Sequence, residues 1–171
     1  SDAPATRGPA GIAEWNWITE PGFYGWPLCM GANEPFRDVD YLTSPATVGD
    51  FFDCDAPIND SIHNTGVETL PPARPADVFY GYQRASDQGS GLNQGGGLAP
   101  MGGPVYDFDE TLDSDTKFPS SYDGKAFFYE WSRNRMFNFL LADDATTEAF
   151  VPGEAVEKVT PFLPQTQFLA P

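Results

Sequence analysis

The stretch that decides the fold class is Lys125-Ala126-Phe127-Phe128-Tyr129-Glu130, then Trp131-Ser132-Arg133-Asn134-Arg135, then Met136-Phe137-Asn138-Phe139-Leu140-Leu141. Its first and third blocks are short, rich in aromatic residues and bounded by turn residues, which is typical of β-strands. The five residues between the two blocks suit a hairpin connection, and Asn134 stands at a natural turn position. The stretch therefore predicts two adjacent antiparallel strands.

The rest of the chain extends this pattern to an all-β protein with long loops. Further strands are predicted at 78–82 and 103–108, and apolar and polar residues alternate in the run 155–159. Proline and glycine each account for 17 of the 171 residues and aromatic residues for 15%, which suits a loop-rich β-protein and disfavours long helices. Two segments, about 29–74 and 85–97, have few periodic runs, and irregular stretches of this length are typical of functional loops or linkers.

The net charge of −16 comes from acidic residues scattered along the chain. This pattern predicts a solvated acidic surface, which repels nucleic-acid phosphates and anionic lipids. No stretch approaches the roughly 18 apolar residues of a membrane span. Residues 1–5 have neither the basic start nor the apolar run of a signal peptide, so we expect a chain that either is not secreted or begins after processing.

Two cysteines, Cys29 and Cys54, lie 25 positions apart in loop-like sequence. They could form a disulfide, remain free thiols or provide half of a metal site, but neither has a second Cys or a His at metal-ligand spacing. The loop context favours the disulfide. Such a bridge would stabilise the fold by roughly 3 kcal/mol in the chain-entropy model, and it would indicate an oxidising compartment.

Four further motifs occur in order between about Arg7 and Leu141. They are Glu14-Trp15-Asn16, Tyr24-Gly25-Trp26-Pro27, Ala99-Pro100-Met101-Gly102-Gly103-Pro104-Val105-Tyr106 and Tyr122-Asp123-Gly124-Lys125. Together they resemble the glucose/sorbosone dehydrogenase family, six-bladed β-propellers that use pyrroloquinoline quinone (PQQ) and calcium. The Cys pair and Asn59-Asp60-Ser61 are most similar to its secreted bacterial branch, which implies a disulfide and a secreted, extracellular or periplasmic location.

The resemblance implies that residues 1–171 are part of a propeller. Four to six predicted strands make one to two blades of four strands, whereas six blades need about 24 strands. Family members are roughly twice this length or more. We therefore expect a complementary polypeptide that completes the propeller and covers its exposed strand edges.

By the same resemblance, the side chain of Glu14 and the backbone carbonyl of Tyr24 would hold a structural calcium ion. Calcium prefers oxygen ligands, and the glycines at 22 and 25 allow a tight loop to turn its carbonyls inward. The alternative is that Glu14 is a solvent-facing strand residue.

The resemblance also places Pro100, Met101 and Gly102 against PQQ and a catalytic calcium, where glycine allows a flat cofactor to approach the backbone. The alternative is a glycine-rich turn before a strand. Phe36 lies near the position of an aromatic residue that contacts the cofactor in the family.

Arg133, Asn134 and Arg135 match a hairpin that gives the family cationic and backbone contacts to the cofactor. Arginine suits this role because it pairs with carboxylates in a planar, bidentate way, and PQQ carries three carboxylates. The alternative is a basic turn that pairs with local carboxylates such as Glu130.

No catalytic residue is assigned. The only histidine, His63, lies downstream of the family's catalytic base, and we expect a surface residue. Lys125 is expected to be a turn residue without a catalytic role, and Asn59 fits the N-glycosylation pattern. Serine-nucleophile, phosphate-binding and dinucleotide signatures are absent from the sequence.

The function implied by the resemblance is quinone-dependent oxidation of a sugar, with the base supplied by another segment. Two alternatives stand beside it. One is a secreted, calcium-stabilised propeller module that binds carbohydrate or a protein partner without redox activity. The other is a purely structural acidic β-domain, whose stability would not respond to a chelator.

Overall fold

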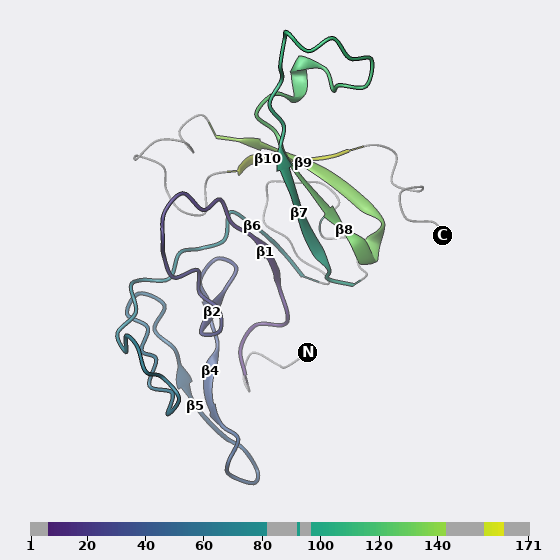
Figure 1. Cartoon of the computed structure of the whole chain (residues 1–171). Coiled ribbons are helices and arrows are strands. Elements are labelled where there is room, and N and C mark those ends of the chain that lie inside the picture. Colours follow the sequence, from purple (N-terminus) through teal and green to yellow (C-terminus); the bar gives the residue numbers. More distant parts are fainter. Residues whose placement is uncertain (1–6, 82–91, 93–96, 143–155, 163–171) are drawn as a thin grey trace.

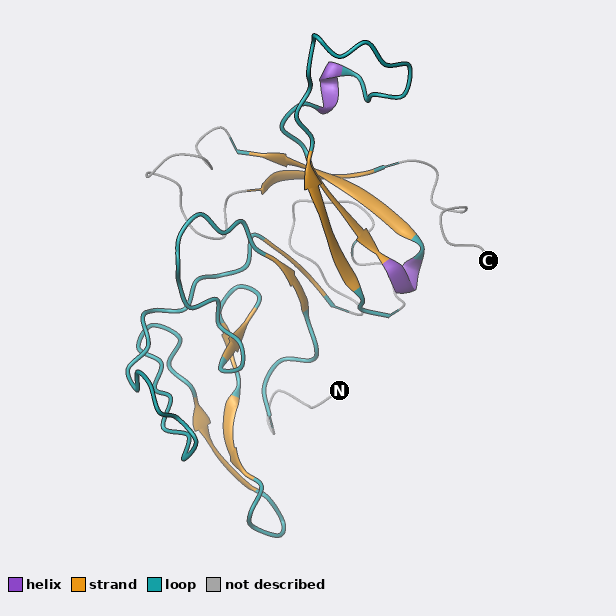
Figure 2. Cartoon of the chain, viewed as in Figure 1, coloured by secondary structure: helices purple, strands orange, loops and turns teal. Residues whose placement is uncertain are grey.

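The computed structural model describes residues 7–81, 92, 97–142 and 156–162 of the chain, and these residues form an all-β fold (Figures 1 and 2). Apart from two single-turn 3₁₀ helices, η1 (Ser120–Tyr122) and η2 (Trp131–Arg133), no helix occurs in these ranges. None is therefore long and apolar enough to cross a membrane. The predicted all-β class is confirmed. The strands form small antiparallel sheets, none of which closes on itself within the described residues.

The largest sheet has four strands in chain order, β7 (Pro100–Val105), β8 (Ala126–Glu130), β9 (Arg135–Leu141) and β10 (Val156–Pro161). The predicted hairpin is confirmed, but its connection is one residue shorter than expected because Arg135 pairs directly with Glu130. Asn134 closes the turn in the left-handed conformation (φ 51°), which asparagine tolerates better than most residues. The predicted strand at 103–108 is shifted, since β7 begins at Pro100 and ends at Val105.

A two-stranded sheet covers one face of this four-stranded sheet. It consists of β1 (Ala13–Trp15) and β6 (Val78–Tyr80), which pair antiparallel. The ring of Trp15 meets that of Phe139 edge-on at 4.7 Å. The shared core contains buried residues of both sheets, namely Ala13, Val78, Tyr80, Leu92, Ala126, Phe128, Phe137, Phe139, Val156 and Val159. Burial of these large apolar side chains is the main stabilising term of the fold.

The opposite face of the four-stranded sheet carries a second aromatic cluster. Phe118, in the long connection between β7 and β8, packs over Phe127 and Phe162 at centroid distances of 5.6 Å. An apolar cavity of about 240 Å³ lies beside these rings. Both faces of the sheet are therefore apolar, as in a sheet that is sandwiched between layers.

The segment 29–74, predicted as one long irregular loop, contains four short strands. They are β2 (Cys29–Met30) paired with β3 (Glu34–Pro35), and β4 (Arg37–Asp40) paired with β5 (Thr47–Phe51). The β4–β5 hairpin extends away from the four-stranded sheet (Figure 1). The disulfide between Cys29 and Cys54 is confirmed, with Cys29 fully buried. Apart from Leu92 and Gly97, the predicted loop 85–97 lies outside the described residues.

Candidate functional site

Glu14, the predicted calcium ligand, is half-buried in β1, so the solvent-facing alternative does not hold. Since Ala13 and Trp15 face the core, Glu14 points to the other side of its strand. There its carboxylate accepts hydrogen bonds from the backbone N–H of Gly31 and from the side chain of Asn16. Burial raises the pKa of Glu14, and these two hydrogen bonds oppose that rise. The site is a carboxylate whose charge is only partly compensated.

Tyr24, the other predicted calcium ligand, begins the loop 24–31, whose first part, as far as Cys29, is a tight turn. Its carbonyl accepts a hydrogen bond from the N–H of Trp26 at 3.2 Å, and the carbonyl of Gly25 accepts from Leu28 and Cys29 at 2.8 Å each. Gly25 has a φ of +89°, and a Cβ there would lie 2.7 Å from the carbonyl oxygen of Cys29. Only glycine therefore fits this turn without strain.

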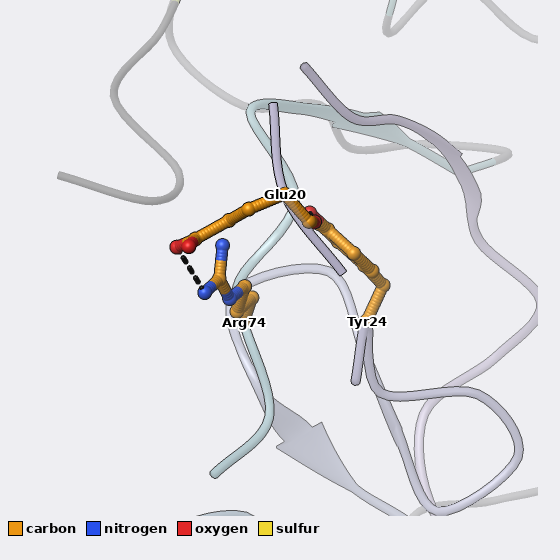
Figure 3. A network of polar contacts seen from close by, with 3 residues as sticks. All are labelled: Glu20, Tyr24 and Arg74. Atoms are coloured by element: carbon orange, nitrogen blue, oxygen red, sulfur yellow. Dashed lines mark hydrogen bonds and ion pairs between the residues drawn. The ribbon is translucent and has the colours of Figure 1, made fainter. Parts of the chain in front are cut away.

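A charged network that the sequence analysis did not find holds this turn in place (Figure 3). Arg74 pairs with the carboxylate of Glu20 at 2.6 Å, and its guanidinium lies 5.8 Å from the ring centroid of Tyr24. The hydroxyl of Tyr24 donates to the carbonyl of Glu20 at 3.2 Å. The hydrogen bond to Glu20 raises the pKa of Arg74. No local pattern signals this pair, because its partners are 54 residues apart.

Glu14 and Tyr24 flank the same loop, since Tyr24 begins the loop 24–31 and Gly31, at its end, binds the carboxylate of Glu14. Nearby, Oδ1 of Asn16 is buried and accepts no hydrogen bond among the described residues. No group of three His, Cys, Asp or Glu side chains gathers in this part of the chain. The side-chain oxygens of Glu14 and Asn16 are of the type that a hard cation prefers, and Oδ1 of Asn16 accepts no hydrogen bond among the described residues. Backbone carbonyls and waters would have to complete such a site.

The two predicted cofactor segments lie side by side at one end of the four-stranded sheet. Pro100 in β7 and Arg135 in β9 both pair with Glu130 of β8, which stands between them. The N–H of Trp131 donates to the carbonyl of Ala99 at 3.1 Å and ties the two connections together. All six residues of β7 are exposed, so Pro100, Met101 and Gly102 form an open edge rather than a turn before a strand.

The side chain of Arg133 binds backbone carbonyls beside this end of the sheet. Its guanidinium donates to the carbonyls of Gly81 at 3.0 Å, Leu92 at 2.6 Å and Gly97 at 2.8 Å, and lies over the ring of Tyr80 at 4.9 Å. These contacts fix both ends of the 81–97 segment against the sheet. Arginine is suited to this role because its rigid fork of five donors can serve several carbonyls at once.

Glu130 is the buried centre of this end of the sheet, although the sequence analysis considered it only as a possible partner for arginine. It is 1% exposed. Its carboxylate accepts hydrogen bonds from the hydroxyl of Tyr80, from the N–H of Ala99 at 2.9 and 3.0 Å, and from the N–H and Oγ of Ser132 at 3.0 and 2.5 Å. A buried charge with this many donors is stable, and it fixes the position of Ala99 and hence of Pro100.

The remaining sequence-predicted residues lie away from both places. Phe36 packs edge-on against Trp26 at 5.9 Å beside the β4–β5 hairpin. His63 is an exposed loop residue, and Asn59 is half-buried. Lys125 lies over the ring of Tyr122 at 4.9 Å.

Comparison with known proteins adds no relative. No protein-family model, no curated protein and no solved structure matches this chain.

Proposed function

We propose that this chain is the calcium- and quinone-contacting part of a secreted, PQQ-dependent sugar dehydrogenase of the β-propeller type. The observation that carries the proposal is the meeting of the two motif segments, 100–102 and 133–135, at one end of a four-stranded antiparallel sheet. The meander of this sheet, with strands in chain order, is the arrangement of one propeller blade. The disulfide between Cys29 and Cys54 is compatible with an extracellular or periplasmic location.

In this proposal the residues at the end of the sheet position a flat, anionic cofactor. Glu130 fixes Ala99, so that the backbone of Pro100 to Gly102 presents a rigid open edge. A Cβ placed at Gly102 would meet no atom within 4 Å, so the space beside it is free for a ligand. Arg133 binds three backbone carbonyls, so in this proposal it positions the segment beside the cofactor. Asn134 and Arg135 are candidate contacts to the carboxylates because they match the family's hairpin. When bound, the quinone supplies the two-electron acceptor for oxidation of a sugar at C1.

A glycine pair provides the sharpest test of the quinone contact. Gly102→Ala adds a methyl group in open space and leaves the fold intact, whereas Gly103→Ala would place its Cβ 2.8 Å from the carbonyl oxygen of Phe127. We expect Gly102→Ala to keep the wild-type melting temperature and to lower PQQ affinity at least tenfold in a fluorescence titration with calcium present. A chain that binds no PQQ, or a Gly102→Ala variant that binds it normally, would refute the proposed contact.

The calcium site is tested by the melting temperature with calcium and with a chelator. Calcium should raise the melting temperature, because a ligand that binds only the folded state stabilises it. Glu14→Gln should abolish this response, since it removes the only carboxylate of the proposed site. Glu68→Gln is the matched control, because Glu68 is an exposed carboxylate outside the Tyr24 turn and its Glu20–Arg74 network. An equal calcium response in wild type and Glu14→Gln would contradict the assignment.

In this proposal another polypeptide segment supplies the catalytic base, because the base of the resembled family lies upstream of the Glu14-Trp15-Asn16 motif, whereas His63, the chain's only histidine, lies downstream of Cys54. We expect native mass spectrometry to find a complementary polypeptide that denaturation releases. A single species of 18.7 kDa under both conditions would contradict the split enzyme.

This position of His63 favours a second function, a secreted calcium-stabilised module that binds carbohydrate or a protein partner without redox activity. Calcium-dependent stability without PQQ uptake would support this function over the first.

A further inference from the structure

A cleft of about 390 Å³ lies beside the β4–β5 hairpin, apart from the residues of the proposed calcium and quinone sites. Its walls include the side chains of Trp26, Phe36 and Tyr41, and Arg7, Arg37 and Asp38 also line it. Ligand sites usually combine aromatic walls with a few placed polar groups in a hollow of this size. The cleft therefore has the make-up of a binding site.

Two of its aromatic side chains are unusually exposed, Trp26 at 67% and Tyr41 at 65%. Both are nevertheless held in place. The ring of Trp26 meets Phe36 edge-on at 5.9 Å and 88°. Arg7 lies over the ring of Tyr41 at 4.9 Å and donates to its hydroxyl at 2.5 Å. Rings that are exposed yet fixed bind a ligand at a low cost in conformational entropy.

Polar groups without partners lie beside these rings. The carboxylate of Asp38 and the indole N–H of Trp26 take part in no hydrogen bond within the described residues, so they offer an acceptor and a donor to a ligand. Arg37 is engaged at one end of its guanidinium, where Nη1 donates to the carbonyl of Gly49 at 2.9 Å, and the group lies 3.9 Å from the ring centroid of Phe51. Its Nε is buried and has no hydrogen-bond partner among the described residues. Arg37 serves to fix the wall of the cleft.

We propose that this cleft binds a neutral oligosaccharide. A sugar ring has an apolar face of C–H groups that packs on an aromatic ring, and hydroxyls at its edge that both donate and accept hydrogen bonds. The rings of Trp26 and Tyr41 can pack against the apolar faces of sugar rings. The carboxylate of Asp38 and the indole N–H of Trp26 can accept from and donate to the sugar hydroxyls. A net charge of −16 repels polyanions, which favours neutral over acidic glycans. The site shares no residue with the proposed quinone contacts, so it succeeds or fails independently of the quinone proposal. It rests on the carbohydrate-binding function proposed above only in its ligand class, and the calcium response of the fold tests that function separately.

The test is isothermal titration calorimetry of the full chain, without quinone, against the tetraoses of β-linked glucose, mannose and xylose, with tetragalacturonate as the acidic comparison. We expect at least one neutral tetraose to bind and tetragalacturonate to bind more weakly. Trp26→Ala and Tyr41→Ala should each lower the affinity at least tenfold, and Trp26→Tyr should retain most of it because a ring remains. Trp131→Ala is the matched control, since Trp131 is 56% exposed at the end of the four-stranded sheet.

Melting temperatures show whether each variant folds, and Tyr41→Ala keeps the test valid should Trp26→Ala unfold. Absence of binding by every neutral tetraose would overturn the proposal. So would tighter binding of tetragalacturonate, which would assign recognition to charge, or wild-type affinity in both alanine variants. Self-association that Trp26→Ala abolishes, without any glycan binding, would assign the cleft to a protein partner and overturn the proposal as well.

Discussion

Tyr80→Phe isolates one hydrogen bond of the buried carboxylate at the end of the four-stranded sheet. Tyr80 is 1% exposed, and its hydroxyl donates to Glu130. Its ring lies 6.0 Å from Phe128 and 4.9 Å from the guanidinium of Arg133, and phenylalanine preserves both contacts. The variant therefore loses only a hydrogen bond to a buried charge, which contributes about 1.5–3 kcal/mol. For a chain of this size that corresponds to a fall in melting temperature of roughly 3–12 °C.

Urea unfolding monitored by tryptophan fluorescence measures this loss, and an unchanged m-value shows that the denatured state is unaffected. Tyr106→Phe is the matched control. Its hydroxyl donates to the uncharged carbonyl of Phe118 at 2.9 Å in an exposed position, so its loss should be below about 1 kcal/mol. Equal losses in the two variants, or no loss in Tyr80→Phe, would refute the reasoning that Glu130 depends on this hydroxyl.

The same variant has a signature at alkaline pH. Burial, and after it the hydrogen bond and charge of Glu130, raises the pKa of Tyr80. The native state therefore keeps the phenolic proton to a higher pH than the unfolded chain does. This contribution to stability is intact below about pH 10 and is lost as the pH rises further. Wild type should lose stability above pH 10 more steeply than Tyr80→Phe, and parallel pH profiles would contradict this cause.

Three further predictions concern other parts of the fold. Replacing Cys29 and Cys54 together by serine should cost about 3 kcal/mol in urea unfolding, because the disulfide closes a loop of 25 residues; a loss below about 1 kcal/mol would contradict it. Gly103→Ala should destabilise by about 1–3 kcal/mol through its clash with Phe127, measured against Gly102→Ala, and equal melting temperatures would show that the strand relaxes. Without calcium, Glu14→Gln should lose less stability than wild type as the pH rises from 4 to 7. The reason is that the pKa of Glu14 is higher in the native state than in the unfolded chain, so the native state favours the protonated carboxyl. The stability that this proton binding contributes is present below the ordinary pKa of 4.5 and is lost as the pH rises above it.

The elements that the sequence predicted well are those in which local pattern and tertiary packing agree. In β8 and β9, Phe128, Phe137 and Phe139 fill the core, and the aromatic residues that signalled strands are the residues that pack. The disulfide between Cys29 and Cys54 was also predicted, because the loop context favoured it over free thiols and the family resemblance implied it. The all-β class followed from such segments, since a buried aromatic strand carries its signal in its own residues.

The strands β4 and β5 could not be predicted in this way, because long-range contacts rather than core burial stabilise them. The backbone N–H of Arg37 donates to the carbonyl of Arg7, and the backbone N–H of Phe52 donates to the carbonyl of Phe36, both at 2.9 Å. Phe51 at the end of β5 is 48% exposed and packs under the guanidinium of Arg37 instead of entering the core. Without a buried face there is no alternation of apolar and polar residues, so periodicity cannot reveal such strands.

The predicted site shows the same limit in its polar residues. The pattern around Arg133 pointed to a cofactor, yet its guanidinium binds the backbone carbonyls of Gly81, Leu92 and Gly97, which lie 36 to 52 residues away along the chain. Glu130, at the end of a predicted strand, was considered only as a carboxylate that could pair with the basic turn, yet the fold surrounds it with donors from Tyr80, Ala99 and Ser132. Residue type reveals what a side chain can bind, but only the fold decides which partners reach it. A cofactor role for this end of the sheet must therefore rest on groups the fold leaves accessible, and the exposed edge at Gly102 is the strongest of these.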